Sequence, residues 1–170
     1  SIGNEDDQFD WTEGWSGTNE NWFAKIDFGK GNRGIEADNF ELGFLNTPIS
    51  FPSITNMTLV GPGSAADGAT FTENQGAKLR RGTKAIFNNV MIKGFKTGFD
   101  VEHNEGLSYI GTDLKVVGYS FEDVPATVKG KKTDGSSADA SALLSGSTSA
   151  TGAGAGAGKP TWANGWAIGF

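Results

Sequence analysis

Four charged residues stand at matching places in four short apolar triplets, where their side chains could act together. The first residue of each triplet is apolar and the second is charged; the charged residues are Asp10, Glu36, Arg80 and Asp100. If the triplets stack as neighbouring strands, these side chains form one outward column with a spacing of about 4.8 Å. Adjacent carboxylates at that spacing repel one another unless a proton or a cation intervenes. The column is thus a candidate cation-binding or acid–base site, and a merely solvated face is the alternative.

Acidic residues near the start of the chain offer a second candidate metal site. Asp6, Asp7 and Asp10 supply the carboxylate oxygens that Ca²⁺ prefers. Their spacing fits neither the helix-loop-helix calcium motif nor the Gly-rich nonapeptide of calcium-binding β-rolls, so a solvated acidic turn is the alternative. The single histidine, His103, excludes a multi-histidine zinc site. The sequence therefore implies no cofactor other than this candidate Ca²⁺.

Two tryptophans could contact a sugar. Trp15 and Trp22 lie close together in the sequence, and the exposed face of an indole can stack on a sugar ring. Large aromatic side chains more often fill a core, because they bury much apolar area per residue. Glycan stacking and core packing both stay open for these two residues.

A repeating pair of strands must position these side chains. The short members are the triplets at 9–11, 35–37, 79–81 and 99–101, and the longer strand-like runs are 22–28, 54–60, 86–92 and 110–117. The triplets recur at intervals of about 20 to 44 residues, within the range of solenoid repeats. The runs ITNMTLV (54–60) and IFNNVMI (86–92) match when Ile54 is placed over Ile86. Glycine interrupts nearly every window long enough for a helix.

The pattern predicts an all-β protein, a right-handed parallel β-helix (solenoid) of about four coils. A short strand, a turn, a longer strand and a variable loop make one coil, and stacked coils bury a continuous core. An antiparallel sandwich is the rival fold, because it also has short strands at regular intervals. The regular alternation of short and long strands favours the β-helix.

Composition divides the chain into three regions. Residues 1–129 hold the expected coils, and residues 130–160 form a Gly/Ala/Ser-rich loop or linker that buries too little apolar surface to order itself. Residues 161–170 alternate aromatic and small residues, which predicts a docked C-terminal strand. Its apolar side chains are Trp162, Trp166, Ile168 and Phe170.

Charge and composition exclude several classes of protein. The net charge of −6 argues against a nucleic-acid binder, which needs a basic surface. The chain has no cysteine, so it has no disulfides and no thiolate site. No apolar run approaches the roughly 20 residues that span a bilayer.

Several segments resemble secreted right-handed β-helix repeat proteins of Bacteroidetes and related marine bacteria. They are DDQFDWTEGW (6–15), RGIEADN (33–39), TPISFPSITNMTLVG (47–61), LRRGTKAIFNN (79–89), GFDVEHNE (98–105) and the final GWAIGF. The resemblance implies the β-helix fold and a secreted or cell-surface location. It also implies that earlier coils and a secretion signal precede this region, which would make the chain a C-terminal portion.

Two classes of function follow from these observations. The favoured one is a non-catalytic extracellular structural β-helix: a scaffold, an adhesin or a filament subunit that assembles with itself. Assembly would use head-to-tail stacking or donation of the strand bearing Trp162, Trp166, Ile168 and Phe170. The alternative is a module that binds a cell-surface polysaccharide, or a Ca²⁺-dependent lyase. In lyases of this fold carboxylates hold Ca²⁺ beside a basic Arg or Lys, and Glu36 with Arg80 could imitate that pair.

Overall fold

Two sheets of parallel strands form the body of the molecule. The structure is a computed structural model that describes residues 1–27 and 29–167. The short strands make one sheet in the order β1 (Phe9–Trp11), β3 (Ile35–Ala37), β5 (Gln75–Leu79), β7 (Thr97–Glu102), β9 (Ala126–Lys131) and β10 (Ser137–Ala138). The long strands make the other, in the order β11 (Leu144–Ser145), β8 (Leu114–Glu122), β6 (Ala85–Lys93), β4 (Phe51–Val60) and β2 (Ser16–Lys25).

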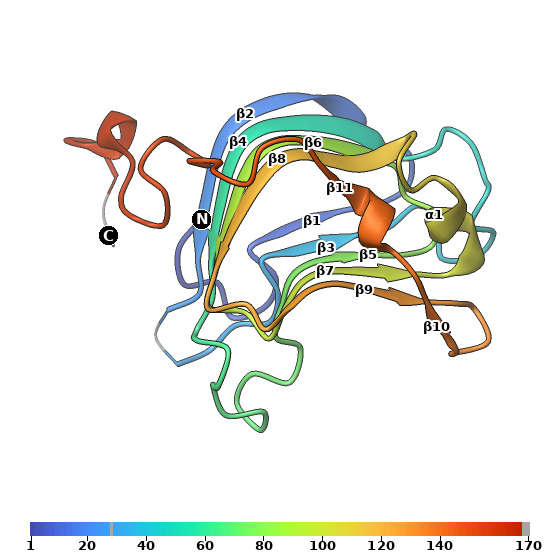
Figure 1. Ribbon diagram of the computed structural model, residues 1–170, viewed down its shortest axis with the longest axis horizontal. Helices are drawn as coiled ribbons and strands as arrows, with labels where there is room; N and C mark the ends of the chain where they lie inside the picture. The colour runs from blue at the N-terminus through green and yellow to red at the C-terminus, as the bar shows by residue number, and fades with distance from the viewer. Residues whose placement is uncertain (28, 168–170) are drawn as a thin grey trace.

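The chain passes alternately through the two sheets, so each short strand and the long strand after it make one coil. Figure 1 shows the coils stacked behind one another, with the long strands above and the short strands below. Every pairing between coils is parallel, and β10 alone among the described strands pairs antiparallel, with β9. The parallel β-helix prediction is confirmed. Strands β1 to β8 make four coils, two strands to a coil, and β9 begins a fifth.

The core fills the space between the two sheets. Alternate residues of each strand point inward, and the side chains of Ile54, Leu79, Phe87 and Phe99 are at most 1% exposed. Burying side chains of this size contributes about 1.5–3 kcal/mol each relative to exposure. The regular elements outside the sheets are short: α1 (Asn104–Ser108), η1 (Ser141–Leu143) and η2 (Thr161–Ala163).

The third short strand lies two residues earlier than the sequence analysis placed it. Strand β5 pairs Ala77 with Ile35 and Lys78 with Glu36, so Lys78 occupies the outward position expected for Arg80. A glycine contact fixes this register. A Cβ on Gly76 would lie 2.7 Å from the carbonyl oxygen of Gly98, so only glycine allows the two coils to approach this closely.

The long strands are also shifted by one residue from the expected match. Ile54 pairs with Phe87, not with Ile86. Asn56 and Asn89 set this register, because both have left-handed φ angles, 59° and 55°, and both bend their strands at the same place.

Asparagine amides form a ladder at this bend. Asn21 has the same left-handed conformation in β2, with φ 59°. The Asn56 side-chain amide donates to Asn21 Oδ1 at 3.1 Å, and the Asn89 amide donates to Asn56 Oδ1 at 2.8 Å. Gly118, with φ 77°, takes this place in β8.

Much of the Gly/Ala/Ser-rich segment lies against the body of the fold. Residues 137–138 extend one sheet and 144–145 extend the other. The following tract, residues 147–158, crosses the outer face of the long strands, as Figure 1 shows. The backbone N–H of Ala153 donates to Thr58 Oγ1 at 2.9 Å, and Asn89 Oδ1 accepts from the N–H groups of Thr151 and Gly152.

The strand expected over residues 161–170 is wrong for the described part, 161–167. Residues 161–163 form the 3₁₀ helix η2 and residues 164–166 a turn. The Ala163 N–H donates to the Pro160 carbonyl and the Ala167 N–H to the Ala163 carbonyl, so local bonds replace the pairing of a strand. Ile168 and Phe170 lie outside the described residues.

Candidate functional site

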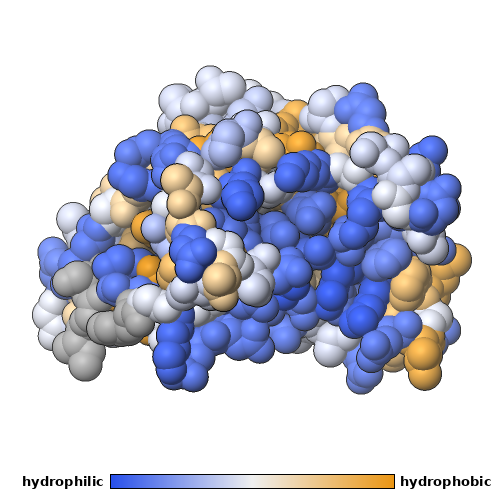
Figure 2. Space-filling view, turned by 90° about the horizontal axis from the view of Figure 1, so that it is seen from below, coloured by the Kyte–Doolittle hydropathy of each residue, from blue (hydrophilic) through white to orange (hydrophobic). Residues whose placement is uncertain are grey.

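The outer face of the short-strand sheet carries a column of charged side chains of both signs. The register places Asp10, Glu36, Lys78, Asp100 and Lys129 side by side, one from each coil. Figure 2 views the molecule from this side, and hydrophilic residues cover the middle of the face. Lys78 stands between two carboxylates, so attraction replaces part of the like-charge repulsion expected for a purely acidic column.

Glu36 lies between two arginines. Its carboxylate contacts Arg33 Nη1 at 2.6 Å and Arg80 Nη2 at 2.9 Å. Burial raises the pKa of Glu36 above its usual value, and the charges of Arg33 and Arg80 offset part of that rise. The two candidate catalytic residues, Glu36 and Arg80, therefore form an ion pair with each other.

Arg80 is held by a second carboxylate. It lies in the turn after β5, next to Asp38, and its Nε and Nη2 donate to the two Asp38 oxygens at 2.9 and 2.8 Å. Burial disfavours the guanidinium charge, but the hydrogen bonds and charges of Asp38 and Glu36 together raise the pKa of Arg80. A guanidinium paired in this bidentate way keeps its proton, so it is poorly suited to act as a base.

Arg81 completes this group. Its Nη1 contacts Asp38 Oδ2 at 2.7 Å, and its backbone N–H donates to His103 Nδ1 at 3.0 Å. The His103 ring packs against Phe44, with the ring centroids 4.6 Å apart. Burial lowers the pKa of His103, so its imidazole favours the neutral form that accepts this hydrogen bond.

A second ion-pair group lies around Glu102, one coil further on. Glu102 accepts from Lys78 at 3.0 Å and also pairs with Lys131. Burial alone would raise the pKa of Glu102, but the two lysines lower it. For Asp100 burial dominates, so its pKa is raised although Lys78 lies 3.6 Å away.

The three candidate calcium ligands have different surroundings. Asp7 accepts from the Arg33 backbone N–H at 2.8 Å and pairs with the Arg33 guanidinium at 3.3 Å. Asp6 accepts from the Asn32 side chain at 3.3 Å and is exposed. Asp10 has no ion-pair partner within residues 1–27 and 29–167, and burial together with the charge of Asp38 raises its pKa. In that part of the chain no three His, Cys, Asp or Glu side chains gather as a metal site would require.

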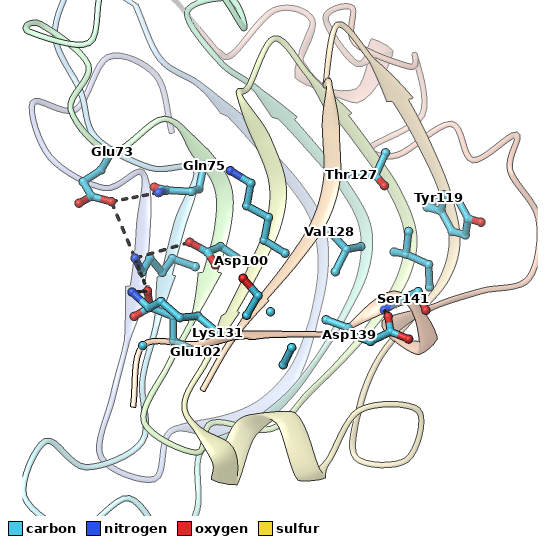
Figure 3. A pocket seen from close by; sticks show the side chains of 18 of the residues that line it. Glu73, Gln75, Asp100, Glu102, Tyr119, Thr127, Val128, Lys131, Asp139 and Ser141 are labelled. Atoms are coloured by element: carbon cyan, nitrogen blue, oxygen red, sulfur yellow. Dashed lines mark hydrogen bonds and ion pairs between the residues drawn. The ribbon is translucent and has the colours of Figure 1, made fainter. Parts of the chain in front are cut away.

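A cavity of about 960 Å³ opens beside the charged column. It extends from the Glu102 group, past β9, to the end of the solenoid, where Tyr119, Val128 and Leu144 line it. Figure 3 shows Glu73, Asp100, Glu102 and Lys131 at one side of it and Tyr119 and Ser141 at the other. Its size is that of a small-molecule or oligosaccharide site, although most of the residues that line it are polar or charged.

The two candidate sugar-stacking tryptophans belong to an aromatic layer at the first coil. Trp15 and Trp22 stack on each other with ring centroids 6.3 Å apart, and Phe9 stacks on Trp22 at 4.2 Å. Trp11, beneath them, is 4% exposed and donates its indole N–H to Thr83 Oγ1 at 3.1 Å. Phe9, Trp15 and Trp22 remain half-buried, so they close the core and still present part of their rings to solvent.

The tryptophans near the C-terminus contact each other and the tract. The Trp162 indole donates to the Ala153 carbonyl at 2.7 Å, and the Trp166 indole donates to the Trp162 carbonyl at 2.6 Å. Trp166 is 69% exposed.

Sequence reasoning missed three of the residues that organise this face. Arg33, Lys78 and Glu102 are nearly buried, yet none was expected to act there. A usable signal is the glycine before three of the four triplets: Gly34, Gly76 and Gly98 precede Ile-Glu-Ala, Ala-Lys-Leu and Phe-Asp-Val. Aligning these glycines gives the register and brings Lys78 into the column.

Comparison with known proteins assigns a family. The family model described as a pectate-lyase-like beta helix domain matches residues 1–167. No curated protein and no solved structure matches the chain. In the described part of the chain, no helix has the length and apolar composition needed to cross a membrane.

Proposed function

Because the chain belongs to the family of pectate-lyase-like β-helix domains, we propose that it is a non-catalytic structural member of that family. It acts as a scaffold or as a subunit of a larger β-helical assembly. The observation that carries this proposal is the internal pairing of the outer face. Glu36, Asp38 and Glu102 each contact two basic side chains, so these carboxylates already have the counter-charges that a cation would otherwise supply.

Catalysis would require different electrostatics at this face. A lyase needs a base that can take a proton from the sugar ring, and a cation to stabilise the resulting charge. Arg80, with its raised pKa and two carboxylate partners, holds its proton firmly. The ion pairs instead join neighbouring coils, since Arg80 directly follows β5 and its partners Glu36 and Asp38 belong to the coil of β3.

The chemical test is a search for β-elimination. The purified chain is incubated with polygalacturonate and with alginate, with and without Ca²⁺, and the ultraviolet absorbance of unsaturated sugar ends is followed. We expect no increase above a protein-free sample, while an active polysaccharide lyase in the same buffers gives one. An increase that disappears in the double variant Glu36→Gln, Arg80→Gln would overturn the proposal.

Polysaccharide binding without cleavage is the second candidate function. The cavity beside the column supports it, because Lys129 at its edge has no ion-pair partner in the described chain and the buried Gln75 Oε1 has no hydrogen-bond partner there. An anionic ligand with hydroxyl groups could pair with the Lys129 ammonium and donate a hydrogen bond to Gln75 Oε1. Binding is tested by passing the chain over the same polysaccharides in immobilised form. Retention of the wild type that is lost in Lys129→Gln would support binding at this cavity.

We further propose that the chain works outside the cell. The resemblance to secreted β-helix proteins of Bacteroidetes supports this location and a bacterial source. An extracellular β-helix without cysteine has no disulfides, so its stability comes from stacked strands, the aromatic layer and the ion pairs between coils.

A further inference from the structure

The single histidine of the chain, His103, has backbone angles close to a region that essentially only glycine occupies. Its φ is 74° and its ψ is 147°. A residue keeps such a conformation only where neighbouring contacts hold it, and strain of this kind concentrates at binding and switching sites. Histidine is also the side chain whose ordinary pKa lies near physiological pH. His103 therefore combines local strain with a group that can change its charge.

Three parts of the fold meet at His103. The backbone N–H of Arg81, in the turn after β5, donates to His103 Nδ1 at 3.0 Å. The imidazole ring packs against Phe44 of the loop between β3 and β4, with the ring centroids 4.6 Å apart. The backbone N–H of His103 donates to the Lys131 carbonyl of β9 at 2.9 Å. One residue thus connects a turn, a loop and a strand of three different coils.

The hydrogen bond from Arg81 requires a neutral imidazole. Nδ1 accepts only while it carries no proton, because both ring nitrogens of an imidazolium are donors. Burial lowers the pKa of His103, which favours the accepting form at neutral pH. Protonation would set two N–H groups against each other. The turn would then lose a bond that holds Arg81 in its own left-handed conformation, φ 53°.

A carboxylate oxygen near the ring has no hydrogen-bond donor. Glu105 lies in the first turn of α1, two residues after His103, and its negative charge favours the protonated imidazole. Its Oε2 is buried and accepts no hydrogen bond from the part of the chain that the structure describes. Leaving a buried acceptor unpaired is costly, and an imidazolium N–H is a donor that would satisfy it. The ring therefore has one partner when neutral and another within the same helix when charged.

The other charged groups around the ring have opposed effects on its protonation. Glu102 favours the imidazolium, whereas Arg80 and Arg81 disfavour it. Charged groups in the turn after β9 are exposed, so they act weakly. The groups that face the ring from β7, β9, the turn after β5 and the loop after β3 are paired with one another, and those in the turn after β9 complete the set: Glu102 with Lys131, Arg80 with Asp38, Arg81 with Glu41, and the exposed Lys132 and Asp134.

The loop that packs on His103 presents apolar side chains to solvent. Leu42 is 88% exposed and Leu45 is 60% exposed. The Asn39 side-chain amide holds the base of this loop, because it donates to the carbonyls of Phe44 and Asn46 at 3.0 Å each. Phe44 lies between the two leucines in the sequence, so its contact with the ring helps to determine how they are presented.

We propose that His103 is a proton-sensitive latch for this loop. When neutral, the ring accepts from Arg81 and supports Phe44. When protonated, it releases the Arg81 N–H and turns to Glu105, and the loop bearing Leu42 and Leu45 loses its support. The strands of both sheets stay in place. This inference goes beyond the proposed structural role, because it makes one loop of a rigid scaffold respond to acid.

Hydrogen exchange at single amides, followed by NMR between about pH 7.5 and pH 5, tests the latch. The released ring has the ordinary pKa of about 6.5 and the latched ring a lower one, so each unit of pH below 6.5 favours release by up to about tenfold. We expect the protection factors of the Arg81 and Asn46 amides to fall by about three- to tenfold over this range. Amides in β6 should keep their protection.

His103→Asn is the matched control. An asparagine tolerates a positive φ, its side-chain oxygen can accept in place of Nδ1, and it does not titrate in this range. Protection at Arg81 should therefore not change with pH in this variant, and circular dichroism at neutral pH confirms that it folds. The inference is overturned by a wild type whose Arg81 protection stays constant, or by an equal fall in His103→Asn.

Glu105→Gln tests the second partner of the ring. Removing its charge disfavours the imidazolium, so the midpoint of release, read from the His103 ring proton signals, should move to lower pH by about half a unit or more. Glu122→Gln removes an exposed carboxylate at the end of β8 that lies away from α1, and should leave the midpoint unchanged. A midpoint that is the same in Glu105→Gln and the wild type would overturn the assignment of Glu105.

Discussion

At the scale of single residues, neighbouring carboxylates on β7 respond to their surroundings in opposite directions. Asp100 and Glu102 point to the same face two residues apart, and both are close to Lys78. The pKa of Asp100 is raised because burial outweighs the attraction of that lysine. The pKa of Glu102 is lowered because Lys131 adds a second cation and overcomes its burial. Counting charges along the sequence cannot separate these two cases.

The opposite shifts predict opposite pH profiles. A carboxyl whose pKa is lowered on folding stabilises the protein above its unfolded pKa, and this contribution disappears as the pH falls through its folded pKa. Glu102→Gln should therefore lower the free energy of unfolding at pH 7, and the deficit should shrink on acidification below about pH 4. A carboxyl with a raised pKa is destabilising when ionised, so Asp100→Asn should match or exceed the wild type at pH 7.

Urea unfolding of both variants between pH 3 and pH 7 measures the two profiles. The difference between Asp100→Asn and the wild type should also close as the pH falls through the raised pKa of Asp100. Parallel curves for the two variants, with the same sign at pH 7, would contradict the assignment.

At the scale of elements, a column of glycines sets how closely the short strands of successive coils approach. A Cβ on Gly76 would meet the Gly98 carbonyl oxygen at 2.7 Å and the Ile92 side chain at 3.0 Å. Gly76→Ala should lower the free energy of unfolding by about 2 kcal/mol, because a backbone atom cannot move aside as a flexible side chain can. Chemical denaturation gives the value.

Gly68→Ala is the matched control for that substitution. A Cβ at Gly68 has nothing within 4 Å, and the residue lies in a loop. Its alanine variant should be as stable as the wild type or slightly more so, since alanine restricts the unfolded chain. Equal losses of stability in both variants would mean that the general effect of replacing glycine by alanine, and not the contact with Gly98, lowers the free energy of unfolding.

The sequence was sufficient to predict the alternation of short and long strands but not their register. The sequence places the triplets at Phe9, Ile35 and Phe99 correctly, because each begins with a large apolar residue directly before a charged one. The third triplet was misplaced because Ala77 is small and Arg80 offered a more conspicuous charge. In β4 and β6 the left-handed residues Asn56 and Asn89 decide the pairing, and a hydrophobicity match does not detect a backbone angle.

At the scale of the whole molecule, the tract 147–158 fastens the C-terminal segment to three coils. It contacts Ser120 in β8, Asn89 in β6 and Thr58 in β4. Low complexity suggested a segment that cannot order itself, and the tract indeed brings few apolar side chains. Polar groups on the receiving sheet provide its hydrogen bonds, and glycine lets it lie close: a Cβ on Gly152 would meet the Met57 carbonyl oxygen at 2.8 Å.

Thr58 offers a direct test of this attachment. Its Oγ1 accepts from the Ala153 N–H at 2.9 Å and donates to the Gly156 carbonyl at 3.0 Å. Thr58→Val keeps the shape and removes both bonds, leaving the Ala153 N–H without a partner, which costs about 1–3 kcal/mol. Hydrogen exchange should accelerate at residues 151–153 and stay slow in β4 and β6.

Thr55→Val is the control, because Thr55 lies in the same strand and makes no side-chain hydrogen bond to the tract. It should leave exchange in the tract unchanged. Faster exchange throughout both sheets of Thr58→Val would show instead that the tract and the body unfold as one unit.

The direction in which the tract lies across the coils also has a mechanical consequence. The tract runs across the strands, so a load pulling the C-terminus away from the sheet would act on its attachments one after another. The bonds at Thr58 would be loaded first, then those at Asn89 and then those at Ser120, because the chain leaves the sheet past β4. Release would then proceed in small steps at low force, and the parallel strands beneath would stay intact until the tract had been peeled away.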